Sequence, residues 1–200
     1  MRLNIQKLQQ GKSIYADQVK RNVDLKLKNK VNWKNVDWLH KFFSKNLGYN
    51  TSLAILASIL PESMGDPDKK QFGDGPGRGL LQWEKGTDRY NNMTKYKRDS
   101  VIKNVPENLQ NQAEYIINTS LNNLHKDDWH HGGKGSGFES GELARKKFIS
   151  KYTPASVKAK IFSMSYVRPK AGKIEADRRS SLIQSLDSIY NSKYFKVQGK

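Results

Sequence analysis

Cysteine is absent from this 200-residue chain. Its absence excludes disulfide bonds and every mechanism that uses a thiolate as nucleophile or metal ligand. The chain must therefore be held together by a hydrophobic core. Its length is sufficient for one domain, or for one domain with an arm.

Long apolar segments are also missing. Hydrophobic residues make up 36% of the chain, and no stretch reaches the roughly 20 apolar residues that a membrane-spanning helix needs. The first residues, MRLNIQKLQQGKSIYAD, lack the apolar core of a signal peptide. We therefore expect neither a membrane span nor a signal peptide.

Acidic residues are scarce, with 19 Asp and Glu against 36 Lys and Arg, which gives a net charge of +17. The excess is divided between the flanks: residues 1–50 carry +8 (11 against 3), 51–140 carry −1 (11 against 12) and 141–200 carry +10 (14 against 4). Basic flanks attract anionic partners such as cell-wall polymers, nucleic acid or anionic membranes, although ordinary solvated helix faces give the same composition. The basic residues do not interleave with the aromatic ones, so we do not expect nucleic acid as the partner.

Residues 52–83 organise the rest of the chain. The run 53–60, LAILASIL, is apolar on all sides and predicts a helix inside a core. It leads into Pro61, Glu62 and Ser63, and a glycine-rich turn region follows before the sequence GLLQW at 79–83.

Glu62 therefore stands at the end of a buried helix. A carboxyl group beside apolar packing loses hydration, which raises its pKa and lets it act as a general acid near neutral pH. The alternative is a solvated glutamate just past a helix end, as most glutamates are.

The apolar helix with Glu62 and Ser63, the GLLQW sequence and Arg89 together resemble the lysozyme domain of bacteriophage tail and virion lysozymes. More distantly they resemble goose-type lysozymes and lytic transglycosylases. Residues 109–116 are similar to the helix that follows the family's core motif. Residues 162–169 with Arg178 and Arg179 are similar to its closing segment. The resemblance covers about residues 34–190.

The resemblance implies a mainly helical α+β lysozyme-like fold with a small β-hairpin or glycine-rich loop beside the cleft. The lysozyme-like domain would span residues 33–200 and a basic arm residues 1–32. The implied catalytic acid is Glu62, and Arg89 would form a structural ion pair. The implied substrate-binding residues are Ser63, Gly79, Gln82 and Trp83.

Gln82 would hydrogen-bond a sugar hydroxyl or N-acetyl group. Trp83 would pack on a sugar face or only on the core. We expect both residues in the cleft or at the start of a helix that continues through Arg89.

One feature of the site, Pro61, departs from the family, and another, the second carboxylate, has two interpretations. Pro61 occupies a position where the family has a polar or helix-friendly residue, and proline is expected to kink or end the helix and so to re-aim Glu62. A second carboxylate is needed as nucleophile or base, and Asp74 is the candidate. Asp before Gly is also common as plain turn chemistry.

No cofactor or metal is expected. Three histidines and two aspartates lie between 125 and 131, but they lack helical zinc-site spacing, and the acids between 66 and 74 do not match a calcium-binding loop. We expect the glycine-rich residues 132–137 to form a loop that borders the cleft.

Apolar periodicity predicts further helices over 34–47, 107–124, 139–151, 155–167 and 173–195, the last with Ile174, Leu182 and Leu186 inward. Residues 23–28 alternate like a short strand. The arm that contains them is expected to be only partly ordered, and it is a candidate for docking to a virion tail or capsid protein.

The function implied by the resemblance is a muramidase that cleaves the β-1,4 bonds between N-acetylmuramic acid and N-acetylglucosamine in peptidoglycan. The alternatives are a lytic transglycosylase and a structural virion protein that has lost activity. Without a signal peptide, the protein would reach the bacterial wall in a virion or through a holin pore.

Overall fold

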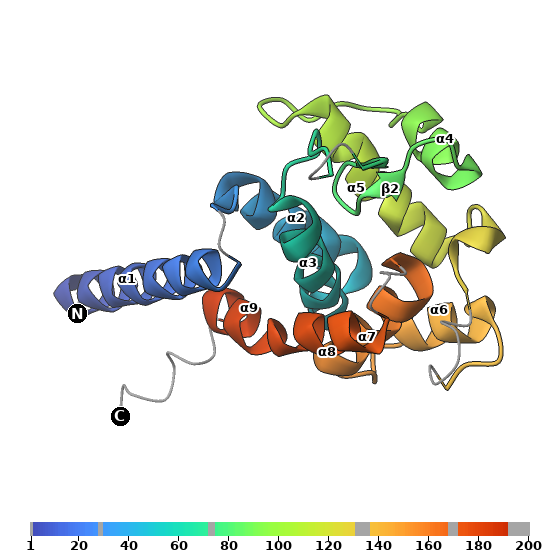
Figure 1. Cartoon of the computed structure of the whole chain (residues 1–200). Coiled ribbons are helices and arrows are strands. Elements are labelled where there is room, and N and C mark those ends of the chain that lie inside the picture. Colours follow the sequence, from blue (N-terminus) through green and yellow to red (C-terminus); the bar gives the residue numbers. More distant parts are fainter. Residues whose placement is uncertain (1, 28–29, 72–74, 131–136, 168–171, 192–200) are drawn as a thin grey trace.

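The computed structural model describes residues 2–27, 30–71, 75–130, 137–167 and 172–191. Within them the protein is mainly helical with one small antiparallel sheet, as predicted (Figure 1). The helices are α1 (Arg2–Leu27), α2 (Trp33–Leu47), α3 (Tyr49–Ser63), α4 (Asp88–Lys95), α5 (Glu107–Leu121), α6 (Gly141–Ile149), α7 (Ala155–Ile161), α8 (Lys173–Ser181) and α9 (Ile183–Tyr190). A 3₁₀ turn, η2 (Lys126–Asp128), and a π-helical turn, η3 (Phe162–Val167), complete them.

Helix α3 is the centre of the core, as its composition predicts. Every residue from Thr51 to Leu60 is buried. Helices α2, α7, α8, α9 and the turn η3 all contact α3. A helix without a polar face is stable only when it is covered on all sides, and these elements cover it.

The sheet consists of β1 (Gly77–Arg78) and β2 (Trp83–Glu84). The strands are antiparallel, with Gly77 opposite Glu84 and Arg78 opposite Trp83. This hairpin is the small β element that the resemblance implies for the glycine-rich region, and residues 72–74 before it lie outside the described part of the chain.

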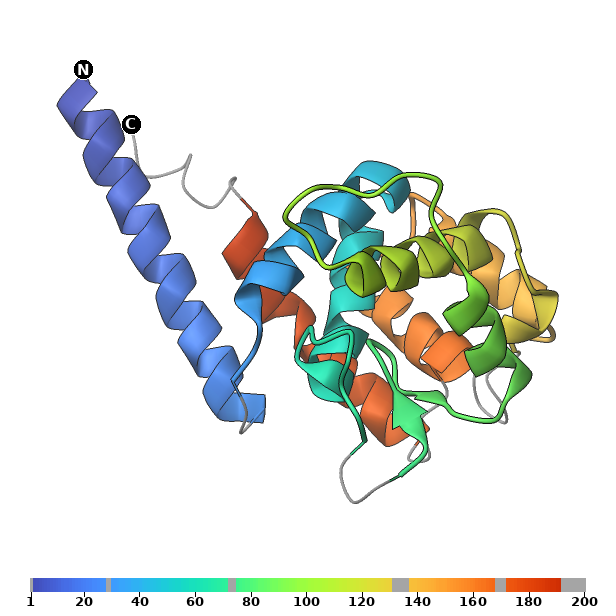
Figure 2. The ribbon, with the colours of Figure 1, turned by 90° about the horizontal axis from the view of Figure 1, so that it is seen from above.

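The arm differs from the prediction. Residues 23–27 belong to α1 and form no strand, because Val23 and Leu27, four residues apart, are both buried while Leu25 between them is 76% exposed. Burial with a spacing of four is the pattern of a helix face. Helix α1 contacts α9 and extends beyond the other helices (Figures 1 and 2).

Some other expected elements differ from the structure. The helix expected over 107–124 ends at Leu121. The last helix is divided at Leu182 into α8 and α9, and Ile174, which we expected to point inward, is 75% exposed. Gln82 and Trp83 do not begin a helix: α4 begins five residues later, with the Thr87 side chain accepting from the Tyr90 amide.

Helix α9 is fastened to α2 and α3 by polar and aromatic contacts. The Tyr190 ring stacks on the buried His40 ring with centroids 3.9 Å apart, and the Tyr190 hydroxyl donates to Asp37 at 2.7 Å. Tyr49 donates to Asp187 at 2.8 Å. These contacts set the position of α8 as well, because α8 leads directly into α9.

Candidate active site

The last turn of α3 carries Glu62. We expected Pro61 to kink or end α3, and the structure shows that it does not end the helix, which continues through Pro61 to Ser63. The next residue, Met64, adopts the left-handed conformation that closes helices, and its amide donates to the Leu60 carbonyl at 3.1 Å. Proline removes one backbone donor here without ending the helix, so Glu62 keeps a helical position.

Glu62 is held by Arg179 of α8. Arg179 Nη2 donates to Glu62 Oε1 in an ion pair that links residues 117 positions apart. The Arg179 side chain is 1% exposed, whereas that of Glu62 is 21% exposed. The carboxylate is therefore fixed from the protein side and still open to solvent on the other.

Burial raises the pKa of Glu62, the Arg179 guanidinium acts in the opposite direction, and the charge of Glu175 adds to the rise. Burial also lowers the pKa of Arg179. The site thus favours a proton on Glu62 up to a higher pH than for a solvated glutamate, which is the property that a general acid needs.

Glu175 lies one helical turn before Arg179 on α8. Residues four apart share a helix face, so both side chains belong to the face that meets the end of α3. Glu175 also pairs with Arg178, with Nη1 and Oε1 3.4 Å apart. Its side chain is 23% exposed. Among the described carboxylates, it is the one whose charge acts on Glu62.

The glycine-rich segment is tied together by backbone and amide hydrogen bonds. The Gly79 amide donates to the Lys69 carbonyl at 2.9 Å. Gln82 adopts a positive φ of 52°, and its Nε2 donates to the carbonyls of Gly79 and Lys69 at 3.0 and 3.2 Å. The Gln82 amide therefore closes the turn that joins β1 to β2.

The four residues expected to bind substrate differ in accessibility. Ser63 is fully buried and donates to the Ile59 carbonyl at 3.2 Å, and Trp83 is 3% exposed with its ring edge-on to Tyr115. These contacts favour core roles for both, while Gln82 is half-buried. Substrate binding by all four stays a prediction, and Asp74 lies outside the described residues.

Arg89 forms the structural ion pair that we expected. Its Nε lies 3.6 Å from Asp128 Oδ1, and its guanidinium lies over the Tyr166 ring, 4.2 Å from the centroid. It also donates to the Tyr166 carbonyl at 2.5 Å. These contacts join α4 to η2 and η3.

Sequence reasoning missed Glu175 and gave Arg179 no role at the site. Arginines are rarely fully buried, so nothing in the sequence pointed to a buried position for Arg179. The one available indication was the spacing of Glu175 and Arg179, a pattern that also occurs on exposed helix faces.

A comparison with models of protein families shows which family the chain belongs to. The family model of the phage tail lysozymes matches residues 34–186. The chain belongs to the phage tail lysozyme family. Membership makes it a lysozyme-like protein associated with peptidoglycan and with the phage virion, and it agrees with the mainly helical fold. Neither curated proteins nor solved structures give a match.

Two further searches cover only the described residues. They find no group of three or more histidine, aspartate or glutamate side chains arranged to hold a metal ion. In the same part of the chain, no helix combines the length and the apolar character needed to cross a membrane. His131 and the loop expected at 132–137 lie largely outside the described part.

Proposed function

We propose that the protein is a peptidoglycan hydrolase that cleaves the β-1,4 bond between N-acetylmuramic acid and N-acetylglucosamine. The observation that carries the proposal is Glu62: a half-buried carboxyl at the end of the central helix, with its pKa raised by burial and one face open to solvent. Membership of the phage tail lysozyme family supports the substrate class.

In this mechanism Glu62 protonates the glycosidic oxygen as the sugar gains oxocarbenium character. The proton leaves with the departing sugar hydroxyl, and Glu62 is left charged beside Arg179. Because Arg179 stabilises the charged carboxylate, it lowers the free energy of the state in which Glu62 has given its proton to the glycosidic oxygen.

A second carboxylate would activate water on the other face of the sugar, or attack it directly. The sequence offers Asp74, and the described structure adds Glu175, on the α8 face that meets Glu62. A base needs a separation of roughly 6.5–9.5 Å from the acid to leave room for water, and a nucleophile needs about 5 Å. The products distinguish these two pathways.

Two alternatives remain open. A lytic transglycosylase would use Glu62 without a second acid and let the sugar's own hydroxyl attack. A structural virion protein is favoured by one observation, the ion pair itself, because Arg179 stabilises the charged form of Glu62, which cannot donate a proton.

The deciding experiment compares wild type and Glu62→Gln on purified peptidoglycan, with mass spectrometry of the released fragments. Glu84→Gln, an exposed carboxylate on β2, is the matched control. We expect wild type and the control to release reducing-end muropeptides and Glu62→Gln to release none. Anhydro-sugar ends would identify a transglycosylase, and an inactive wild type would identify a structural protein.

The division into a basic arm, residues 1–32, and a hydrolase domain, residues 33–200, is part of the same proposal. We assign the arm to attachment, with a tail or capsid protein as its partner, because α1 extends away from the remaining helices (Figure 2). Virion packaging would then deliver the hydrolase to the wall.

A further inference from the structure

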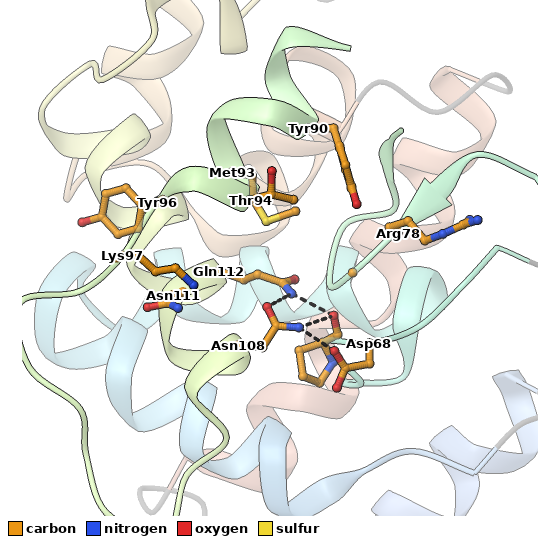
Figure 3. A pocket seen from close by; sticks show the side chains of 12 residues that line it. Asp68, Arg78, Tyr90, Met93, Thr94, Tyr96, Lys97, Asn108, Asn111 and Gln112 are labelled. Atoms are coloured by element: carbon orange, nitrogen blue, oxygen red, sulfur yellow. Dashed lines mark hydrogen bonds between the residues drawn. The ribbon is translucent and has the colours of Figure 1, made fainter. Parts of the chain in front are cut away.

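A cavity of about 220 Å³ lies between α4, α5 and the glycine-rich segment (Figure 3). Its lining contains none of Glu62, Arg179 and Glu175, and it shares only Gly79 with the residues expected to bind substrate. It is smaller than a pocket for a drug-sized molecule, which has roughly 300 Å³ or more, so its ligand is about one sugar or dipeptide unit.

The floor of this cavity is rigid because amide groups connect it. Gln112, which is 2% exposed, accepts from the Leu80 amide at 2.8 Å and donates to the Pro67 carbonyl at 2.8 Å and to Asn108 at 2.9 Å. Asn108 in turn donates to Asp68 Oδ1 at 2.5 Å. The floor is thus held in place before any ligand arrives.

Two side chains above this floor have polar groups to spare. Figure 3 shows the Tyr90 hydroxyl and the Lys97 ammonium directed toward the space over Asn108 and Gln112, whereas the Arg78 guanidinium points away from it. Arg78 is engaged with the carbonyls of Gly75 and Gly77, at 2.6 and 2.7 Å. Among the described residues, neither Lys97 nor the Tyr90 hydroxyl has a hydrogen-bond or ion-pair partner.

The two ends of the cavity differ in charge. Lys97 and the Asn111 side chain stand at one end, and Asp68 stands at the other (Figure 3). The Asn111 oxygen accepts from the Arg98 amide at 3.1 Å, so its NH₂ group is the part left for a ligand. A ligand that carries a carboxylate at one end and amide N–H groups toward the other would match both ends. Met93 and the tyrosine rings supply apolar walls between them.

We propose that this cavity binds the carboxylate-bearing peptide stem of peptidoglycan, with Lys97 and the Asn111 NH₂ group holding the carboxylate. The inference rests on the proposed function for the choice of ligand, and it concerns binding alone. The site would let the enzyme select glycan strands that carry a peptide stem.

The test is calorimetric titration with N-acetylmuramyl-L-alanyl-D-isoglutamine, which ends in a free carboxylate and has no bond between sugars to cleave. The same compound with that carboxylate converted to an amide, and chitotriose, which lacks a peptide, are the comparison ligands. The variant is Lys97→Met, with Lys95→Met as the control, since Lys95 is exposed on α4 and does not line the cavity.

We expect the free carboxylate form to bind wild type and Lys95→Met equally, and Lys97→Met about tenfold more weakly, as for the loss of one charge-assisted hydrogen bond. The amidated ligand should be weakened by a similar factor on wild type. Equal binding to wild type and Lys97→Met, or chitotriose binding that depends on Lys97, would overturn the proposal. Binding that persists in Glu62→Gln separates this site from the catalytic proposal.

Discussion

At the scale of single residues, Arg179 is the residue of the candidate site whose burial most destabilises the fold. Arg179 Nε and Nη1 are buried without a hydrogen-bond partner among the described residues, and only Nη2 reaches Glu62. A buried cation with unpaired donors destabilises the fold, whereas a methionine of similar size would not. The arrangement is therefore hard to explain by stability alone, and it agrees with a role in positioning the Glu62 carboxylate.

His40 gives a prediction about stability and pH. Burial lowers the pKa of this histidine from 6.5 to about 4, although the nearby Asp37 acts in the opposite direction. As the pH falls below 6.5, His40 binds a proton in the unfolded chain, whereas in the folded chain it binds one only near pH 4. The free energy of unfolding therefore decreases between pH 6.5 and pH 4. The loss from this group is about 2 kcal/mol between pH 7 and pH 4.5.

The measurement is urea unfolding of wild type and His40→Phe at pH 7 and pH 4.5. Phenylalanine keeps the stack on Tyr190 but cannot titrate, so the variant should lose about 2 kcal/mol less than wild type on acidification. The Asp and Glu carboxyl groups titrate in both proteins, so their contributions cancel in the comparison. Parallel losses in the two proteins would show that His40 does not cause the acid sensitivity.

At the scale of elements, the contact of the glycine-rich segment with α5 leads to a second prediction. Gly79 has a φ of +79°, and a Cβ placed there would lie 2.6 Å from Gln112 Oε1. Gly86 has a φ of +95° and open space around it. Alanine at Gly86 should cost about 1 kcal/mol of stability through the backbone alone.

Alanine at Gly79 should cost the same backbone term and a further 1–3 kcal/mol, roughly, because Gln112 is buried and cannot move aside without losing its hydrogen bonds. Chemical denaturation of the Gly79→Ala and Gly86→Ala variants measures the difference. Similar losses in both would mean that Gln112 yields to the new methyl group and that the contact adds no constraint.

The elements also show what the sequence could and could not predict. Helix α3 was predictable because a run of apolar residues without a polar face allows few structures, whereas the hairpin was expected from the resemblance to a family. The alternation in residues 23–28 suits both a strand and a helix, and the packing of α1 on α9 decides between them. Ile174 is exposed because α8 turns Ala176 and Arg179 inward.

The candidate site was predictable only in part, for a related reason. Glu62 followed from its place after the apolar run and from the resemblance to a family. The partners of Glu62 come from α8, more than 110 residues later, and the pairing of Arg179 with Glu62 depends on how α8 packs against the end of α3. Local periodicity contains no information about such a contact.

At the scale of the whole molecule, the arm and the helical body are joined over a short distance. Lys20 pairs with Asp37 at 2.8 Å, and Asp24 accepts from the Val31 amide and from Trp33 Nε1, each at 3.1 Å. Among the α1 side chains that the structure describes, from Ile14 onward, Val23 and Leu27 are the buried apolar ones. All of these contacts lie in the last two turns of the helix, and Ile14, nearer its start, is 67% exposed.

Deletion of residues 2–19 should therefore leave the body intact. The segment contains three basic residues against one acid, so the net charge falls only from +17 to +15 and attraction to an anionic wall persists. We expect the melting temperature to change by less than about 3 °C and peptidoglycan release, if wild type shows it, to be unchanged.

Asp24→Ala in the full chain is the contrasting variant: it removes two hydrogen bonds at the junction and should lower stability by about 1–2 kcal/mol. A deletion that destabilises more than Asp24→Ala would mean that the start of α1 belongs to the core. That result would also remove the basis for treating the arm as a separate attachment element, because a segment needed for folding cannot be free to engage a tail protein.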